Sequence, residues 1–145
     1  MPATFKLLRR VEFSETDLAG IVHFSNFFKY MEAAEHAFFR SLGSSVVAPS
    51  SGIGWPRVHA DCDYKRPLRF EEQVEIALSI REIRSKAIVY DFVFTRKEPA
   101  PVEECARGSL VAACVTKGAD GIMRAVALPD ELVEKLKTAQ AAAAS

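Results

Sequence analysis

The segment Glu12 to Phe28, EFSETDLAGIVHFSNFF, holds residue types that could act on an acyl carbonyl. Its carboxylate Asp17 lies nine residues before Asn26, and Gly20 between them allows a tight turn. Asp17 can therefore fold back toward a helix that begins near Asn26, where unpaired N–H groups carry partial positive charge. A carboxylate beside such donors suits acyl transfer, because it attacks the carbonyl or activates water while the N–H groups stabilise the oxyanion. The alternative is that Asp17 only closes a turn, a common place for aspartate.

The residues after this segment predict a long amphipathic helix. Ser25 and Asn26 are good N-caps and Gly43 is a suitable terminator. The expected helix has about 17 residues and is roughly 25 Å long. So wide an apolar surface indicates a helix enclosed by a sheet. Its apolar residues are Phe27, Met31, Ala34, Phe38 and Leu42 on one face, widened by Phe28, Ala37 and Phe39.

Alternation of apolar and polar residues predicts strands on both sides of this helix. The first is expected at 5–13, where Arg9 is the one polar break in the apolar phase. Pro129 precedes a short amphipathic helix that carries Leu132 and Leu136. Between the two helices, strands are expected at 57–65, 73–81, 87–94, 103–116 and 122–128.

This order of elements predicts an α+β fold. Strands that follow one another through short turns favour an antiparallel sheet, and one curved sheet wrapped around one long apolar helix is the hotdog architecture. The 145 residues predict a single domain at 1–145. Its core is expected at about 5–137, and 138–145 is expected to be a flexible tail.

The composition excludes several classes of protein. Lys and Arg number 19, as do Asp and Glu, so the formal net charge is zero. This balance argues against a nucleic-acid partner, although a local basic patch can still bind an anionic small ligand. Three cysteines without CxxC spacing argue against a disulfide framework or a zinc ribbon, and no metal site is visible. The sequence has no secretory signal and no run of about 18 apolar residues, so we expect no membrane span. A cytoplasmic location is expected.

The run T-D-x-A-G-I-V-x-F-x-N-F-F-K-Y-M-E, from Thr16 to Glu32, resembles the 4-hydroxybenzoyl-CoA thioesterase family of hotdog-fold acyl-CoA thioesterases. The segment DYKRPLRF, Asp63 to Phe70, is similar to a second signature of that family, and Leu128-Pro129 before the final helix also matches. The first motif is specific and the later two are weaker. The resemblance covers roughly residues 5–137.

The resemblance implies hydrolysis of an acyl- or aroyl-CoA to the free acid and coenzyme A. It implies that Asp17 is the catalytic carboxylate, as nucleophile or general base, and that the backbone N–H of Phe24 polarises the thioester carbonyl. It also implies sites between the subunits of a homodimer, with dimers pairing into a homotetramer. No cofactor is expected, because coenzyme A is part of the substrate.

His23 departs from the family pattern, in which the 4-hydroxybenzoyl-CoA branch has aromatic residues at both positions 23 and 24. It could contact substrate or assist proton transfer, or it could be a polar loop histidine. The acyl pocket is expected to involve Phe27, Phe28 and Trp55. Aromatic walls pack against aromatic and aliphatic groups alike, so the acyl group stays open.

Coenzyme A carries phosphates, so its site needs cationic groups. Basic clusters in the sequence make Arg66, Arg84 and Lys86 the candidates, although such clusters are often solvated surface. Gly108, beside Ser109 in a predicted strand, could allow close approach of the pantetheine arm.

Two other functions fit the same fold. A hydratase or dehydratase would pair a loop histidine with a helix carboxylate, and His23 with Glu32 or Glu35 is the available match. A non-catalytic module would bind an acyl-CoA or acyl carrier protein without turnover. The intact Asp17 argues against the second, and the surrounding motif argues against the first.

Overall fold

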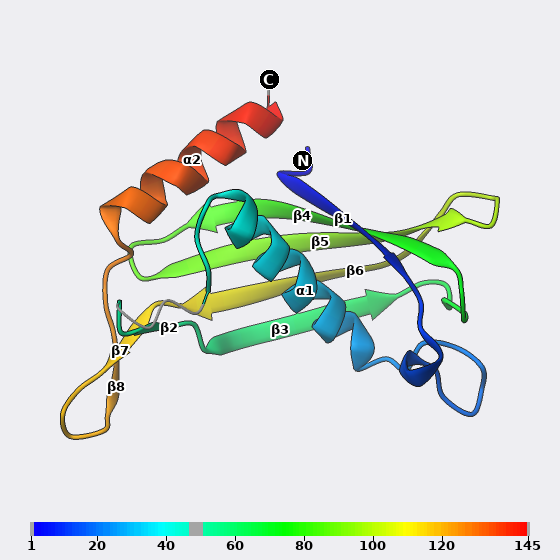
Figure 1. Ribbon diagram of the computed structural model, residues 1–145, viewed down its shortest axis with the longest axis horizontal. Helices are drawn as coiled ribbons and strands as arrows, with labels where there is room; N and C mark the ends of the chain where they lie inside the picture. The colour runs from blue at the N-terminus through cyan, green and yellow to red at the C-terminus, as the bar shows by residue number, and fades with distance from the viewer. Residues whose placement is uncertain (1, 47–50, 145) are drawn as a thin grey trace.

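A computed structural model describes residues 2–46 and 51–144. A curved antiparallel sheet lies against one side of a long helix, and a second helix packs at one end of the sheet (Figure 1). In chain order the elements are β1 (Phe5–Arg10), the 3-10 turn η1 (Phe13–Glu15), α1 (Asn26–Ser41), β2 (Ile53–Gly54), β3 (Arg57–Tyr64), β4 (Gln73–Ile83), β5 (Ala87–Glu98), β6 (Glu103–Ala113), β7 (Val115–Lys117), β8 (Met123–Ala125) and α2 (Asp130–Ala144).

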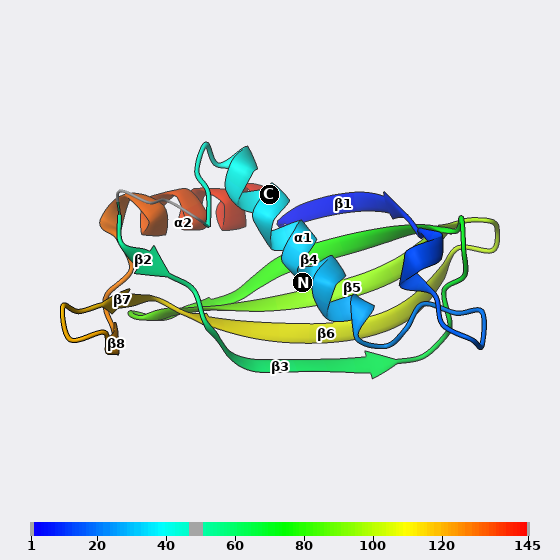
Figure 2. The same cartoon turned by 60° about the horizontal axis from the view of Figure 1, so that its bottom comes forward.

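The main sheet has five strands in the order β1-β4-β5-β6-β3, and all neighbours are antiparallel. Figure 2 shows α1 lying in the concave side of this sheet. The predicted α+β hotdog fold is therefore confirmed.

Helix α1 forms where the apolar spacing predicts it. It spans 16 residues, or about 24 Å, and Gly43 with φ +74° follows its end. Tyr30, Met31 and Ala34 are fully buried against the sheet. Burial of this face, rather than helix propensity, stabilises the helix.

Strand β1 ends at Arg10, three residues earlier than expected. Phe13 lies in turn η1 and is 75% exposed. The physical reason is a capping box, in which the side chains of Glu12 and Glu15 each accept from the other's backbone N–H and turn the chain out of the strand.

A second, three-stranded sheet of β2, β7 and β8 corrects the expectation of a single sheet. The predicted strand 103–116 is divided at Cys114, whose N–H donates to Lys86 O (2.8 Å) and whose carbonyl accepts from Val126 N–H (2.8 Å). The N–H of Cys114 thus extends the β5–β6 pairing one step beyond Ala87 and Ala113, whereas its carbonyl bonds to Val126, and the chain passes into the second sheet there.

Helix α2 continues to Ala144, so residues 138–144, which the sequence analysis assigned to a flexible tail, are helical. Leu136 is fully buried, and Gln140 Nε2 donates to Ile80 O of β4 at 3.0 Å. These contacts hold the last turns of α2 against the sheet.

Strand β3 forms one edge of the main sheet and leaves an apolar face open. The strand forms as predicted, but its burial does not alternate, since Val58 is 64% exposed and Tyr64 is 46% exposed. Cys62, between them in the same phase, is half-buried. Unpaired edges of this kind are open to pairing with another strand.

Gly108 on β6 lies in a closely packed part of the sheet. A Cβ atom there would lie 2.2 Å from Met31 Cε and 2.6 Å from the backbone oxygen of Asp61. The neighbouring Ser109 Oγ donates to Asp61 Oδ2 at 2.5 Å. Met31 occupies the space that a side chain at position 108 would need, and Gly108 also lines a separate pocket of about 430 Å³ with Asp61 and Ser109. Close approach of the pantetheine arm to Gly108 stays a prediction.

Gly108→Ala is expected to lower the free energy of unfolding by about 2–3 kcal/mol, because the new methyl group must displace backbone. Gly54→Ala is the matched control, since its Cβ would make an ordinary 3.6 Å contact with Val115 and cost less than about 1 kcal/mol. Urea unfolding at fixed protein concentration measures both. Equal effects of the two variants would contradict this packing.

Candidate active site

A pocket of about 420 Å³ opens at the end of the sheet where β3 terminates. This volume is within the usual range for small-molecule sites. The pocket brings together four residues singled out in the sequence, namely Asp17, Phe24, Phe27 and Arg66. Its full lining is Asp17, Ile21, Val22, Phe24, Phe27, Tyr64, Lys65, Arg66 and Pro67.

Asp17 lies in a short hairpin-like loop between η1 and α1. Its N–H donates to Ile21 O (2.9 Å), and Gly20 at φ +77° makes the turn. Its Oδ1 accepts from Ala19 N–H at 2.9 Å. Within the part of the chain that the structure describes, Oδ2 has no hydrogen-bond partner. The loop thus fixes one carboxylate oxygen and leaves the other available to a ligand.

The start of α1 supplies a free N–H group to the same pocket. Asn26 N–H donates to His23 O (2.9 Å), and Phe27 N–H donates to Phe24 O (3.4 Å). Among residues 2–46 and 51–144, Phe24 N–H meets no acceptor. Ser25 occupies the N-cap position but makes no capping bond from its side chain. Phe24 N–H is therefore the unpaired donor at this helix end, as an oxyanion site requires.

His23 lies outside the pocket wall and is exposed to solvent. Its Nδ1 is 2.8 Å from Ser25 Oγ, and its ring lies against Phe24 with centroids 4.5 Å apart. These contacts fit a histidine that braces the loop, the second of the two interpretations from the sequence.

Phe27 and Tyr64 form an aromatic wall of the pocket. Phe27 is buried, and its ring meets those of Tyr64 and Phe94 nearly edge-on at 5.1 Å. Tyr64 OH donates to Phe24 O at 2.9 Å. Partial burial raises the pKa of Tyr64 to about 12, so this hydroxyl stays protonated at neutral pH. The sequence interpretation missed Tyr64, although it lies inside the second signature, DYKRPLRF.

Phe28 and Trp55 do not line the Asp17 pocket of a single subunit, so their expected role in the acyl pocket stays a prediction. Phe28 is half-buried and packs against the core. Trp55 packs edge-on against Phe39, with centroids 5.9 Å apart, in a separate cavity near the end of α1. The sequence could not separate them from Phe27, because their distance from Asp17 depends on tertiary packing.

The candidate phosphate ligands fall at two ends of the sheet. Arg66 lines the Asp17 pocket and pairs with Glu103 at 3.5 Å. Arg84 and Lys86 lie in the turn between β4 and β5, at the opposite end from the Asp17 loop (Figure 1). The 8 residues of β3 separate these ends by about 23 Å. One chain therefore does not bring Arg84 and Lys86 to Asp17.

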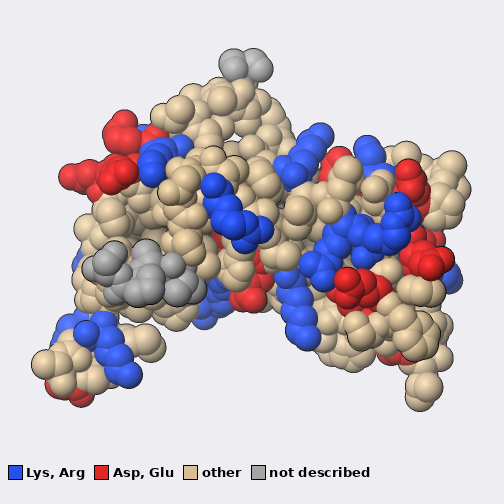
Figure 3. Space-filling model, in the orientation of Figure 1, with Lys and Arg blue, Asp and Glu red and all other residues tan. Residues whose placement is uncertain are grey.

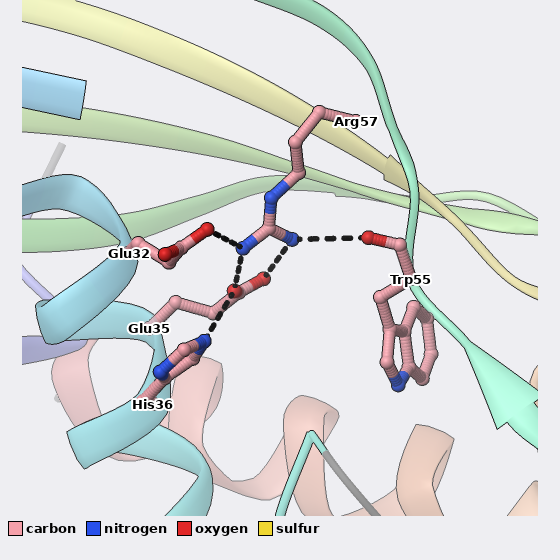
Figure 4. Close-up of polar contacts among 5 residues, drawn as sticks. All are labelled: Glu32, Glu35, His36, Trp55 and Arg57. Carbon is pink, nitrogen blue, oxygen red and sulfur yellow. Dashed lines mark hydrogen bonds and ion pairs between the residues drawn. The ribbon is translucent and has the colours of Figure 1, made fainter. Parts of the chain in front are cut away.

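The helix carboxylates Glu32 and Glu35 belong to a different cluster (Figure 4). Glu35 is only 1% exposed and accepts from both terminal nitrogens of Arg57, one of them at 3.1 Å. Arg57 also lies 3.5 Å from Glu32 and donates to Trp55 O at 3.4 Å, while His36 is 3.9 Å from Glu35. Among residues 2–46 and 51–144 of one chain, neither glutamate pairs with a loop histidine as a hydratase would need.

Figure 3 shows basic and acidic side chains interspersed on the face that carries α1. Across residues 2–46 and 51–144 no set of three or more His, Cys, Asp or Glu side chains could hold a metal ion. Neither described helix has the length and apolarity to cross a membrane.

Comparison with known proteins gives a consistent set of relatives. Residues 11–136 match the family described as the Thioesterase-like superfamily. Over 138 residues the chain is 30% identical to a candidate esterase of Aquifex aeolicus, covering 94% of this chain and 99% of that protein. It is 26% identical over 103 residues to a 4-hydroxybenzoyl-CoA thioesterase of Pseudomonas sp., covering 68% and 73%. A solved gentisyl-coenzyme A thioesterase superposes with a TM-score of 0.75 at 29% identity, covering 91% and 98%.

Proposed function

This chain belongs to the thioesterase-like superfamily, and on that premise we propose that it hydrolyses an aroyl-coenzyme A to an aromatic acid and coenzyme A. One observation carries the proposal: Asp17, with a free Oδ2, and Phe24, with a free N–H, line the same pocket. Two similar proteins named for CoA thioesters of hydroxylated aromatic acids, 4-hydroxybenzoate and gentisate, support the aromatic acyl group.

The proposed reaction consumes one water and one thioester and needs no other reactant. The thioester oxygen accepts from Phe24 N–H, which stabilises the negative charge that develops on it. In one route Asp17 attacks the carbonyl carbon to form an acyl–Asp17 anhydride, which water then hydrolyses to release the acid and restore the carboxylate. In the other route Asp17 removes a proton from the water that attacks the carbonyl carbon directly. The carbon–sulfur bond breaks and the thiolate leaves with a proton as coenzyme A. Both roles of Asp17 remain part of the proposal.

The aromatic wall of the pocket fits an aromatic acyl group. Phe27 and Tyr64 already meet edge-to-face, the geometry that aromatic rings prefer. A benzoyl ring placed against them gains the same contacts. Tyr64 OH is occupied by Phe24 O, so it holds the helix start rather than the substrate.

The exposed edge of β3 supports a homodimer as the functional unit. Two copies related by a two-fold axis would pair their β3 edges antiparallel. The Arg57 end of one strand then lies beside the Tyr64 end of the other, and the β4–β5 turn of one subunit approaches the Asp17 pocket of its partner. This arrangement would let Arg84 and Lys86 reach the phosphates of coenzyme A across the interface. A homotetramer and a cytoplasmic location stay predictions.

The double variant Arg84→Ala/Lys86→Ala is expected to raise KM for an aroyl-CoA at least about tenfold, with little change in kcat, because charge-assisted phosphate contacts are lost. The control is the same acyl group on N-acetylcysteamine, which has no phosphate. Steady-state thiol release measures both substrates. A similar rise in KM for the truncated thioester would contradict a role in phosphate binding.

A substrate panel tests the proposed function. Benzoyl-, 4-hydroxybenzoyl- and gentisyl-CoA are compared with acetyl- and hexanoyl-CoA by thiol release, with EDTA present and no cofactor added. We expect kcat/KM to be at least about tenfold higher for the three aroyl-CoAs than for acetyl- and hexanoyl-CoA, because the aromatic rings gain contacts with the pocket wall. Hydration of crotonyl-CoA without hydrolysis would indicate a hydratase. Tight coenzyme A binding without any turnover would indicate a binding module.

A further inference from the structure

Glu15 lies at the end of turn η1, two residues before Asp17, and its carboxylate is held by three donors. Arg9 Nη2 donates to Oε2 at 2.9 Å. Tyr30 OH and Glu12 N–H donate to Oε1 at 2.9 and 2.8 Å. The side chain is 12% exposed. This carboxylate therefore joins β1, the η1 turn and α1.

The backbone carbonyl of Glu15 is held as well. It accepts from Asn26 Nδ2 at 2.8 Å and from His23 N–H at 2.9 Å. Asn26 is the first residue of α1, and His23 immediately precedes Phe24. Glu15 thus holds both ends of the loop between η1 and α1, the end that leads to Asp17 and the end that contains Phe24 N–H.

The chemistry of these partners makes the contacts strong. A shielded carboxylate is costly unless its oxygens are hydrogen-bonded, and here a cation supplies one of the donors. Arg9 also lies over the ring of Tyr30, 5.3 Å from its centroid. Burial and the Glu15 carboxylate raise the pKa of Tyr30, so its hydroxyl stays a donor to Glu15.

We propose that Glu15 is a positioning residue that sets the distance between the Asp17 carboxylate and Phe24 N–H, an inference that rests on the proposed thioester hydrolysis. Glu15 does not line the pocket, so it acts through these two groups rather than on the substrate. Small displacements of a reacting group have large effects on rate, about 100-fold for 1 Å.

The test compares three variants of the full chain in aroyl-CoA hydrolysis. Glu15→Gln keeps the side-chain shape but removes the charge, and it places an amide NH₂ group beside donors that now bind the carboxylate. Tyr30→Phe removes one hydroxyl and leaves the packing of the ring. Glu75→Gln is the matched control, because Glu75 is 15% exposed and pairs with Lys6 (3.9 Å) and Lys97 (3.8 Å) away from the loop.

For Glu15→Gln we expect kcat to fall about 100-fold with KM within about threefold of wild type. For Tyr30→Phe we expect a fall of about tenfold, and for Glu75→Gln a change below about twofold. Glu15→Asp, which keeps the charge, should recover part of kcat. Hydrogen exchange of amides 16–24 should quicken in Glu15→Gln but not in Glu75→Gln.

Three outcomes would overturn the inference. If wild type hydrolyses aroyl-CoA and Glu15→Gln keeps its kcat, Glu15 has no positioning role and the proposed function stands. If wild type hydrolyses no thioester, the proposed function fails and this inference fails with it. Should Glu15→Gln not fold, an unchanged kcat in Tyr30→Phe overturns the inference in the same way.

Discussion

Asp17→Asn should lower kcat for aroyl-CoA hydrolysis by about 10³-fold, within the range measured when a catalytic acid or base is removed. The amide has nearly the same shape, and its oxygen can still accept from Ala19 N–H, so the loop should keep its conformation. What is lost is the negative charge that attacks the carbonyl or accepts a proton. Steady-state kinetics and thermal unfolding of the same preparation separate a chemical effect from a structural one.

Asp120→Asn is the matched control for this prediction. Asp120 Oδ1 accepts from the N–H of Ile122, two residues on, at 3.0 Å, just as Asp17 Oδ1 accepts from Ala19. Asp120 lies in the turn between β7 and β8 and is absent from the Asp17 pocket wall. We expect its kcat to match wild type. An Asp17→Asn enzyme that retained more than a tenth of wild-type kcat would rule out the catalytic assignment.

Arg57→Met should lower the free energy of unfolding by about 3 kcal/mol, near the low end of the range for breaking a buried ion pair. Glu35 is 1% exposed and would be left as a buried charge without its main partner. The low end applies because Arg57 keeps 25% of its own side chain exposed, so water screens part of the interaction. Chemical denaturation at fixed protein concentration measures the change.

Arg81→Met supplies the comparison for this variant. Arg81 also donates through two nitrogens to one carboxylate, that of Asp91, but the Arg81 side chain is 52% exposed. Exposed pairs contribute at most about 1 kcal/mol. The double variant Glu35→Leu/Arg57→Met should regain much of the loss, because it removes both charges together. If Arg57→Met cost no more than Arg81→Met, the buried pair would have no special weight.

The fold could be predicted from the sequence because its elements depend on local periodicity. The apolar spacing of α1 and the alternation along β4 and β5 each specify one buried face. The division of one predicted strand at Cys114 could not be predicted in this way. It depends on hydrogen bonds to Lys86 and Val126, which are distant in the chain.

The site could be predicted only in part. Asp17 and Phe24 lie close in sequence, so a single loop can bring both to one pocket. Trp55 precedes strand β3 and Tyr64 is its last residue, so the two lie at opposite ends of that strand. Tyr64 lines the pocket, whereas Trp55 packs against Phe39 at the other end. Glu15 had one detectable signal, namely Arg9, because a cation on the inward phase of a strand needs an anionic partner.

The strand order of the main sheet has a consequence for how the chain folds. Strands β4, β5 and β6 follow one another and pair locally, whereas β1 pairs with β4 across the sequence from Phe5 to Leu78. Contacts between distant segments form later, because closing a long loop costs more entropy. We expect the central strands to assemble first and β1 to dock after β4 has been synthesised. The Asp17 loop, attached to β1, would then take its final shape among the last events of folding.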